Sequence, residues 1–229
     1  MKPEISFFLP AYNESGNIEE AVRKAKEVLM LVASEYEIII VNDGSKDDTG
    51  KIIDQIASKD SRVKVIHHKV NKGYGDALWT GIQAAKYEWF FFTDSDLQFD
   101  IKEISKLIKF IPEYKIVIGY RSPRKDPFMR LVNAKGWNIL VRLMFGLKVK
   151  DIDCAFKMMN TKMVASLPLI TRGATMSAEI LIRLQKNGVI WKEVPVTHLP
   201  RKKGSATGAK PKVIIKAFKE LFKLYRRGI

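Results

Sequence analysis

The first half of the chain alternates between short apolar runs and longer amphipathic segments. This alternation is typical of a parallel β-sheet, because each parallel connection has to return across the sheet and is usually a helix. The expected strands are residues 5–9, 36–41, 62–67, 88–93 and 115–119, and the expected helices are 17–32, 47–58, 75–86 and 101–110. The pattern therefore predicts an α/β fold with a mostly parallel sheet flanked by helices.

The fourth apolar run, Trp89 to Phe92, is followed closely by two acids, Asp94 and Asp96. A strand that is buried on both faces reads as a continuous apolar run, and ligands of open α/β sheets bind beyond the carboxyl ends of such strands. Two carboxylates on one face of an extended segment repel each other unless a cation or a proton intervenes. The pair therefore indicates a metal site for a phosphorylated ligand.

Two other interpretations of this acidic pair stay open. The acids could simply cap the next helix or face water. Phosphatases that form an aspartyl-phosphate also carry Asp-x-Asp after a buried strand, but they carry it early in the fold. Here three predicted strands precede Asp94, which argues against that chemistry.

Length and composition limit the remaining possibilities. A chain of 229 residues fits one domain with a core that needs no disulfide. Cys154 is the only cysteine, which agrees with a reducing, cytosolic compartment. The chain starts without the apolar core of a signal peptide, and no apolar stretch approaches the roughly 18 to 20 residues that cross a bilayer. We therefore expect no membrane span.

The net charge of +15 is concentrated at the end of the chain, since residues 201–229 carry ten Lys or Arg against one acid. Such a tail attracts polyanions: nucleic acid, acidic lipid or a phosphorylated substrate. Residues 211–228 have the pattern of a basic amphipathic helix of interfacial type, which would dock on a membrane or pack on the domain. Residues 127–145 predict a second such helix. The expected division is a catalytic domain, 1–210, and a C-terminal helix, 211–229.

Four loops at predicted strand ends form one ordered pattern, namely Pro10-Ala11-Tyr12-Asn13-Glu14, Val41-Asn42-Asp43-Gly44-Ser45, Asn71-Lys72-Gly73-Tyr74-Gly75 and Asp94-Ser95-Asp96-Leu97-Gln98. In order and spacing they resemble the family 2 glycosyltransferases of GT-A fold. Within that family the chain is similar to the polyprenyl-phosphate sugar synthases, of which dolichyl-phosphate mannose synthase is typical. The resemblance covers most of the chain and implies a single Rossmann-like domain.

The resemblance implies a donor site for a nucleotide sugar. Its expected residues are Pro10, Ala11, Tyr12 and Glu14 around the base and ribose, Asp43 on the base, and Lys72, Asp94 and Ser95. Asp96 and Gln98 match the ligands of a divalent metal. Carboxylate, amide and diphosphate oxygens are hard ligands, which suits Mg²⁺ or Mn²⁺. Taken alone, the glycine-rich loop around Lys72 would be a weak phosphate-binding signal.

The second half of the chain supplies the acceptor side by the same resemblance. The lipid phosphate would be gripped by Arg121, Arg130, Arg201 and Ser205. Arginine suits this task because its planar fork binds phosphate oxygens bidentately, although a solvated surface charge is the alternative for each one. In the Asp151-to-Lys157 segment, Cys154 and Ala155 stand where the family usually has Ser and Gly. Likewise, Ser95 stands where the family usually has Ala between the two acids. These exchanges of one small residue for another affect the fine geometry of the site more than the reaction. Glu179 matches a helix acid that we expect to support structure.

The implied reaction moves a hexose from a nucleotide diphosphate sugar to a polyprenyl phosphate by one inverting displacement, with Asp94, Asp96, Arg121 and Arg201 as the catalytic residues. Mannose from GDP-mannose is the first choice and glucose from UDP-glucose the second. A phosphate monoester, with a second pKa of roughly 6, is already ionised and needs no strong base. That agrees with the lack of any evident His-carboxylate or Ser-His arrangement. The enzyme would work at the cytoplasmic face of a membrane, peripherally or through an anchoring partner.

Two rival functions stay open. A nucleic-acid-binding module would explain the basic tail but leaves the acidic strand ends unexplained, and the aromatic and basic signatures of common RNA-binding folds are missing, so we expect no nucleic-acid partner. A family 2 transferase that acts on a sugar or protein hydroxyl would need a carboxylate base. Asp153 is the candidate for that base.

Overall fold

The computed structural model describes the backbone of residues 2–111, 113–126, 128–201 and 211–229, and the side chains of the same residues apart from 128–130 and 211. One sheet of seven strands runs through the centre in the order β3-β2-β1-β4-β6-β5-β7. The strands are β1 (Glu4–Ala11), β2 (Glu35–Asn42), β3 (Val63–His67), β4 (Trp89–Thr93), β5 (Ile116–Arg121), β6 (Phe156–Asn160) and β7 (Lys192–Val196). All neighbours are parallel except β6, which runs antiparallel to β4 and β5.

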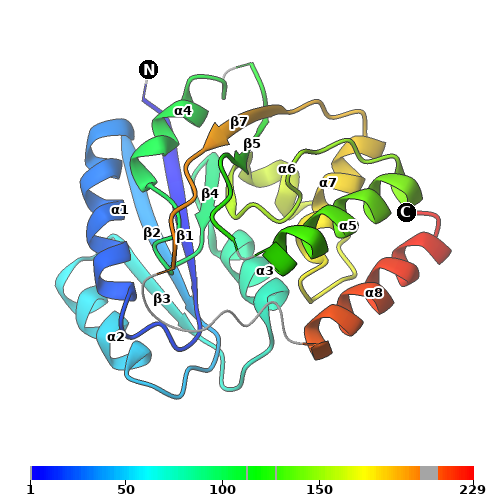
Figure 1. Ribbon diagram of the computed structural model, residues 1–229. Coiled ribbons are helices and arrows are strands. Elements are labelled where there is room, and N and C mark those ends of the chain that lie inside the picture. Colours follow the sequence, from blue (N-terminus) through cyan, green and yellow to red (C-terminus); the bar gives the residue numbers. More distant parts are fainter. Residues whose placement is uncertain (1, 112, 127, 202–210) are drawn as a thin grey trace.

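Helices cover both faces of this sheet (Figure 1). They are α1 (Ile18–Val32), α2 (Thr49–Lys59), α3 (Tyr74–Ala84), the 3₁₀ turn η1 (Ile101–Glu103), α4 (Ile104–Ile108), α5 (Phe128–Phe145), α6 (Thr161–Ala165), α7 (Met176–Lys186) and α8 (Pro211–Arg226). In Figure 1, α1 and α2 lie on one side of the sheet, and α3, α5, α7 and α8 lie on the other. This is the layered arrangement that alternating strands and helices predict.

Aromatic packing fixes the middle of the sheet, where β1 lies between β2 and β4. Phe7 and Phe91 have ring centroids 5.2 Å apart, and Phe8 and Phe90 stack at 5.6 Å. Gly81 of α3 packs against the Phe8 ring, since a Cβ there would lie 2.4 Å from it. The helix can approach the sheet this closely only because that side chain is absent.

The five strands and the first three helices expected from the sequence are confirmed, with ends that differ by one or two residues. The expected helix 101–110 is instead a 3₁₀ turn followed by the short α4. The second half holds elements that the alternation did not predict, above all the antiparallel β6. Its sequence, FKMMN, is short and is broken by Lys157, which is only 2% exposed.

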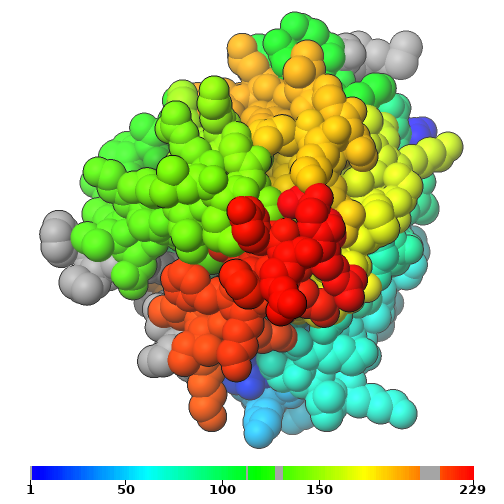
Figure 2. All heavy atoms as spheres, turned by 90° about the vertical axis from the view of Figure 1, so that its right-hand side faces the viewer, coloured from blue at the N-terminus to red at the C-terminus, as the bar shows by residue number. Residues whose placement is uncertain are grey.

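The last helix, α8, packs on the outside of the domain against α5. Ala217, Leu221 and Leu224 are its buried residues, and Phe218 makes an edge contact with Trp137 of α5. Figure 2 shows α8 (orange to red) lying across this face beside α5 (green). In the parts of the chain that the structure describes, no helix combines the length and the apolar character that a membrane crossing requires.

Candidate active site at the carboxyl edge of the sheet

The loops that follow β1 and β2 meet at the edge where both strands end. Asn13 has a φ of +56° and joins the loops twice: its backbone N–H donates to Ser45 Oγ (3.0 Å), and its side-chain oxygen accepts from the Lys46 N–H (2.8 Å). Asparagine tolerates this left-handed conformation better than most residues. Further along, the Glu14 N–H donates to Thr49 Oγ1 at the start of α2 (2.9 Å). The two loops therefore form one rigid rim.

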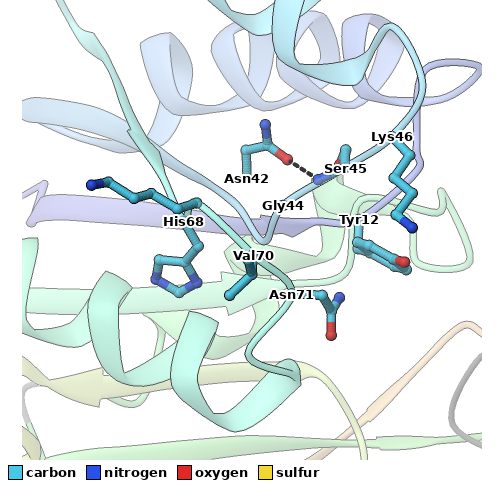
Figure 3. A pocket seen from close by; sticks show the side chains of 9 residues that line it. Tyr12, Asn42, Gly44, Ser45, Lys46, His68, Val70 and Asn71 are labelled. Atoms are coloured by element: carbon cyan, nitrogen blue, oxygen red, sulfur yellow. Dashed lines mark hydrogen bonds between the residues drawn. The ribbon is translucent and has the colours of Figure 1, made fainter.

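A cavity of about 500 Å³ lies beside this rim (Figure 3). Its lining residues are Tyr12, Asn42, Gly44, Ser45, Lys46, His68, Lys69, Val70 and Asn71. Gly44 is required here, since its φ is +68° and a Cβ would lie 2.6 Å from the backbone nitrogen of Asn71. The size suits a small-molecule ligand such as a nucleoside. Of the expected donor-site residues only Tyr12 lines this cavity.

Among the polar residues of this cavity, Asn42, Ser45 and Asn71 belong to loops named from the sequence but were given no role there, and Lys46 directly follows one of these loops. Asn42 accepts a hydrogen bond from the Ser45 N–H (3.0 Å), which is the dashed contact in Figure 3. Each of the four lies within two residues of Gly44 or Gly73. This proximity to glycines in strand-end loops is the signal that could have found them.

Asp43 is only 3% exposed and is not among the residues that line this cavity. Its Oδ1 accepts from the Lys72 N–H (2.9 Å), and its Oδ2 accepts from the Gly73 N–H (2.8 Å). The carboxylate thus fastens the loop before α3 to the end of β2. Contact with a base stays a prediction for Asp43. The Lys72 side chain is exposed.

Ser95, Asp94 and Asp96 lie on the loop after β4, next to the end of β1. The Ser95 hydroxyl donates to the Pro10 carbonyl (2.8 Å), which ties the loop to β1, whose last residue, Ala11, is buried. Burial and the neighbouring Asp96 charge raise the pKa of Asp94 to about 7, against the opposing effect of Arg201 and Arg121. A raised carboxyl pKa means that negative charge is held here at a cost.

Asp96 is 4% exposed and is held from two directions. Its Oδ1 accepts from the Gln98 N–H (3.0 Å), and its Oδ2 lies 2.5 Å from Nη2 of Arg201. Arg201 also reaches Glu14, whose Oε1 is 3.4 Å from Nη1. Leu97, the residue between Asp96 and Gln98, has a φ of +60°, a left-handed conformation that costs a bulky residue about 1 kcal/mol or more. The strained turn fixes where the carboxylate points.

A divalent cation fits the acidic corner, which is formed by Asp94 and Asp96, only together with a bound ligand. In the described part of the chain, no three side chains of Asp, Glu, His or Cys converge well enough to hold a metal by themselves. Mg²⁺ is usually bound by one or two carboxylates plus substrate phosphates, and the charge of Asp94 beside Asp96 is what a cation would relieve. The Gln98 amide nitrogen instead donates to the Leu199 carbonyl (3.2 Å). Metal ligation by Gln98 therefore stays a prediction.

Arg121 at the end of β5 is locked in a buried ion pair. Its Nε and Nη2 donate to the two carboxylate oxygens of Asp151, each at 2.7 Å, and its Nη1 lies 3.5 Å from Asp126. The side chain is 7% exposed, which excludes a solvated surface charge. Because the fork is already occupied, the described contacts make Arg121 a support for the 151–155 loop. Its grip on an acceptor phosphate stays a prediction.

The 151–155 loop, which carries Asp153, lies at the edge of the sheet where β4 ends, because Phe156 pairs with Thr93. Asp153 reaches solvent, yet crowding by protein atoms and the charge of Asp151 raise its pKa. The buried Lys157 ammonium holds the turn by donating to the carbonyls of Ile152 (3.0 Å) and Cys154. Burial raises the pKa of the Cys154 thiol to about 12, so the thiol stays protonated and unreactive.

The remaining predicted residues divide into two groups. Ser205 and the Arg130 side chain lie outside the described residues. Glu179 is fully buried and accepts from the Thr171 backbone N–H and hydroxyl (2.7 Å each) and from Arg183 Nε (2.7 Å). These contacts agree with the structural support expected of it.

The model of the family described as glycosyl transferase family 2 matches residues 6–167. Glycosyltransferase AglD of Haloferax volcanii is 32% identical over 86% of this chain and 33% of its own length. A dolichol-phosphate mannosyltransferase of Pyrococcus furiosus is 30% identical over 97% of this chain and 64% of its own. An undecaprenyl-phosphate 4-deoxy-4-formamido-L-arabinose transferase of Pseudomonas savastanoi is 30% identical over 67% of this chain and 46% of its own. The chain thus spans less than two thirds of each of these relatives.

Solved structures of glucosyl-3-phosphoglycerate synthase from Mycobacterium tuberculosis have the same fold. The complex with uridine diphosphate superposes with a TM-score of 0.74 at 22% identity, over 99% of this chain and 81% of that one. The complex with Mn²⁺ and UDP-glucose gives 0.72 at 21% identity, over 96% and 79%. At this identity the likeness carries the fold alone.

Proposed function

Since this chain belongs to glycosyl transferase family 2, we propose that it transfers a hexose from a nucleotide diphosphate sugar to a polyprenyl phosphate. The observation that carries this proposal is the juxtaposition of two features at one edge of the sheet. Tyr12, which lines the nucleoside-sized cavity, lies on the loop after β1, and Ser95, between Asp94 and Asp96, donates to the Pro10 carbonyl at the end of the same strand. A nucleotide in the cavity would place its diphosphate toward the acidic corner.

The names of two relatives favour a polyprenyl phosphate as acceptor. The Pyrococcus protein is a dolichol-phosphate mannosyltransferase, and the Pseudomonas protein is an undecaprenyl-phosphate transferase. Mannose from GDP-mannose is our first choice of donor because the former matches nearly the whole of this chain. UDP-glucose is the second, favoured by the structural neighbour that binds it.

The side chains would share the work as follows. Tyr12, Lys46 and Asn71 would hold the nucleoside, and Asp94 and Asp96 would hold a divalent cation. When bound, Mg²⁺ or Mn²⁺ supplies positive charge to the leaving diphosphate. Arg201 is partly exposed and paired with Asp96 in the described state, so it can exchange that partner for a phosphate oxygen.

The acceptor step needs little from the protein if the nucleophile is a phosphate monoester, which is already anionic at neutral pH. The protein then has to orient the phosphate in line with the leaving group and neutralise charge, which arginines do well. For a hydroxyl acceptor a base would be required. Asp153 lies on the 151–155 loop at the same edge of the sheet, has a raised pKa and is the candidate for that second function.

The test uses donor binding first and transfer second. In a thermal-shift panel of GDP-mannose, UDP-glucose and UDP-N-acetylglucosamine with Mn²⁺, one donor should stabilise the protein above the others. Radiolabel from that donor should then enter polyprenyl phosphate and not free glycans. Transfer to glycans alone would favour the hydroxyl-acceptor function. Salt-sensitive RNA binding with no donor binding would contradict the proposal altogether.

We also propose that the protein docks peripherally on the cytoplasmic face of a membrane through an α5–α8 patch. The patch consists of the exposed apolar side chains Val132, Ile139 and Leu143 of α5 and Ile215, Phe218, Phe222 and Tyr225 of α8. Exposed Lys and Arg flank it on α8, among them Lys219 and Lys223. A basic amphipathic face of this kind suits an anionic bilayer surface, and Figure 2 shows both helices on one side of the molecule.

Changing Phe218 and Phe222 to serine should weaken membrane binding by about tenfold or more. Each change removes a large apolar side-chain surface that the bilayer would otherwise bury. Flotation with liposomes that contain anionic lipid measures this loss. The matched control is Leu31→Ser, since Leu31 is 72% exposed but lies on α1, on the opposite side of the sheet. Equal flotation of the double variant and the control would remove the patch as the docking surface.

A further inference from the structure

His68 and Asp43 make a buried His-carboxylate contact, which was not evident from the sequence and which the proposed reaction does not use. His68 Nδ1 lies 2.7 Å from Asp43 Oδ1, and the two residues are 8% and 3% exposed. The other ring nitrogen, Nε2, lies 3.0 Å from the hydroxyl of Thr80 on α3. In Figure 3 the His68 ring points toward that helix. Both ends of the imidazole are thus fixed by the protein.

The chemistry of the partners assigns the proton. An ionised carboxylate only accepts hydrogen bonds, so Nδ1 carries the hydrogen and donates it to Asp43. In the neutral ring Nε2 then accepts from the Thr80 hydroxyl. With one of its oxygens held by the ring, the carboxylate cannot rotate. A base in a displacement reaction needs a free nitrogen facing the substrate, which His68 lacks in this arrangement.

The orientation of Asp43 decides where the next loop lies. Its two oxygens accept from consecutive backbone amides, Lys72 and Gly73, and Gly73 has a φ of +100°, which favours glycine. The residues just before these amides, Lys69 to Asn71, form one wall of the cavity. The Asp43 carboxylate therefore joins the His68 ring, which itself belongs to the cavity lining, to the backbone of the loop that continues this lining.

We infer that His68 is a positioning residue for the donor: acting through Asp43, it holds the 69–73 loop, of which residues 69–71 line the nucleotide cavity. The identity of the ligand as a nucleotide sugar rests on the proposed function, whereas the fastening of the loop does not. Holding a loop in its bound conformation before the ligand arrives improves affinity, because the ordering cost is already met.

Three variants of His68 separate this role from packing. In His68→Asn the amide nitrogen takes the place of Nδ1 and keeps the bond to Asp43, whereas in His68→Gln it takes the place of Nε2 and keeps only Thr80. His68→Leu keeps neither. The donor KM should rise about tenfold in the Leu and Gln variants and stay within about twofold of wild type in Asn. The kcat and the acceptor KM should hardly change in any of them.

Hydrogen exchange of the free protein tests the same inference without any turnover. Peptides that cover residues 69–74 should exchange faster in the Leu and Gln variants but not in Asn. If the wild type proves to transfer no sugar, this measurement still decides the role of His68. An Asn variant as loose as Leu, or a Leu variant as protected as wild type, would overturn the inference.

His68→Gln carries the same test if His68→Leu does not fold, and Thr80→Val is its matched control. Thr80→Val removes only the hydroxyl that holds Nε2 and nearly keeps the side-chain volume. Because it keeps the bond between His68 and Asp43, it should match His68→Asn, with exchange over residues 69–74 and a donor KM close to wild type. Exchange as fast as in His68→Gln would contradict the inference, because the Thr80 contact and not the Asp43 contact would then hold the loop.

Discussion

Replacing Asp96 with alanine should lower the rate of glycosyl transfer by about a thousandfold or more while the fold stays intact. The loss is this large because charge on a leaving diphosphate must be neutralised in the transition state, and groups that do so are usually the largest single contribution to catalysis. The fold should survive, since Asp96 lies on a loop and its removal ends the repulsion that raises the pKa of Asp94. Arg201 keeps its contact with Glu14.

Initial rates and thermal shifts with and without Mn²⁺ measure this prediction. The wild type with donor should be stabilised by the cation, whereas Asp96→Ala should not respond. Asp100→Ala is the matched control, because Asp100 is an exposed acid on the same loop that accepts from the Lys102 N–H. It should keep wild-type rates. Full activity of Asp96→Ala would remove the metal assignment from the acidic corner.

Replacing Asp151 with alanine should destabilise the protein by about 3–5 kcal/mol, because it leaves the buried Arg121 guanidinium without its bidentate partner. Asp126 lies 3.5 Å from the same guanidinium and should keep the loss near the lower value. Urea unfolding measures the change as a shift of the midpoint. A loss of that size removes a large part of the stability of an ordinary domain.

Two controls separate the loss of the buried Arg121–Asp151 ion pair from the effect of removing any acidic side chain. Glu27→Ala breaks an exposed ion pair with Arg23, in which both side chains are more than half exposed, and should cost less than about 1 kcal/mol. The double variant Arg121→Met with Asp151→Leu should recover most of the lost stability, since apolar groups of similar volume often replace a buried pair without loss. If Asp151→Ala cost no more than Glu27→Ala, the buried pair would not support the loop as described.

The first half of the fold could be predicted because a strand that is buried on both faces leaves an unbroken apolar run. β1, β2 and β4 each contain such a run, at residues 7–11, 38–41 and 89–92, although the buried Ser6 and Glu37 interrupt β1 and β2 near their starts. β6 does not, since Lys157 sits in the middle of the sheet with its ammonium turned back to carbonyls of the preceding turn. A buried lysine looks like a surface residue in any sequence pattern.

The acids of the site could be predicted for the same reason, because they follow those apolar runs directly. The cavity wall could not, since the contribution of Lys46 and Asn71 depends on how the loops fold. The left-handed φ of Asn13 and of Gly44 sets that fold. The pairing of Arg121 with Asp151 could not be predicted either. It joins residues 30 positions apart, and the hydrophobic periodicity of the sequence does not show the chain reversal that brings them together.

The reversed direction of β6 has a consequence for how such a protein can diversify. Because β6 runs against its neighbours, the segment that comes before it, with Asp151 and Asp153, reaches the same edge as the segments that come after β1, β2 and β4. The two halves of the working surface are therefore encoded by separate stretches of the gene. Under the proposed function, substitutions between β5 and β6 would alter the choice of acceptor while the segments proposed to bind the donor stay unchanged.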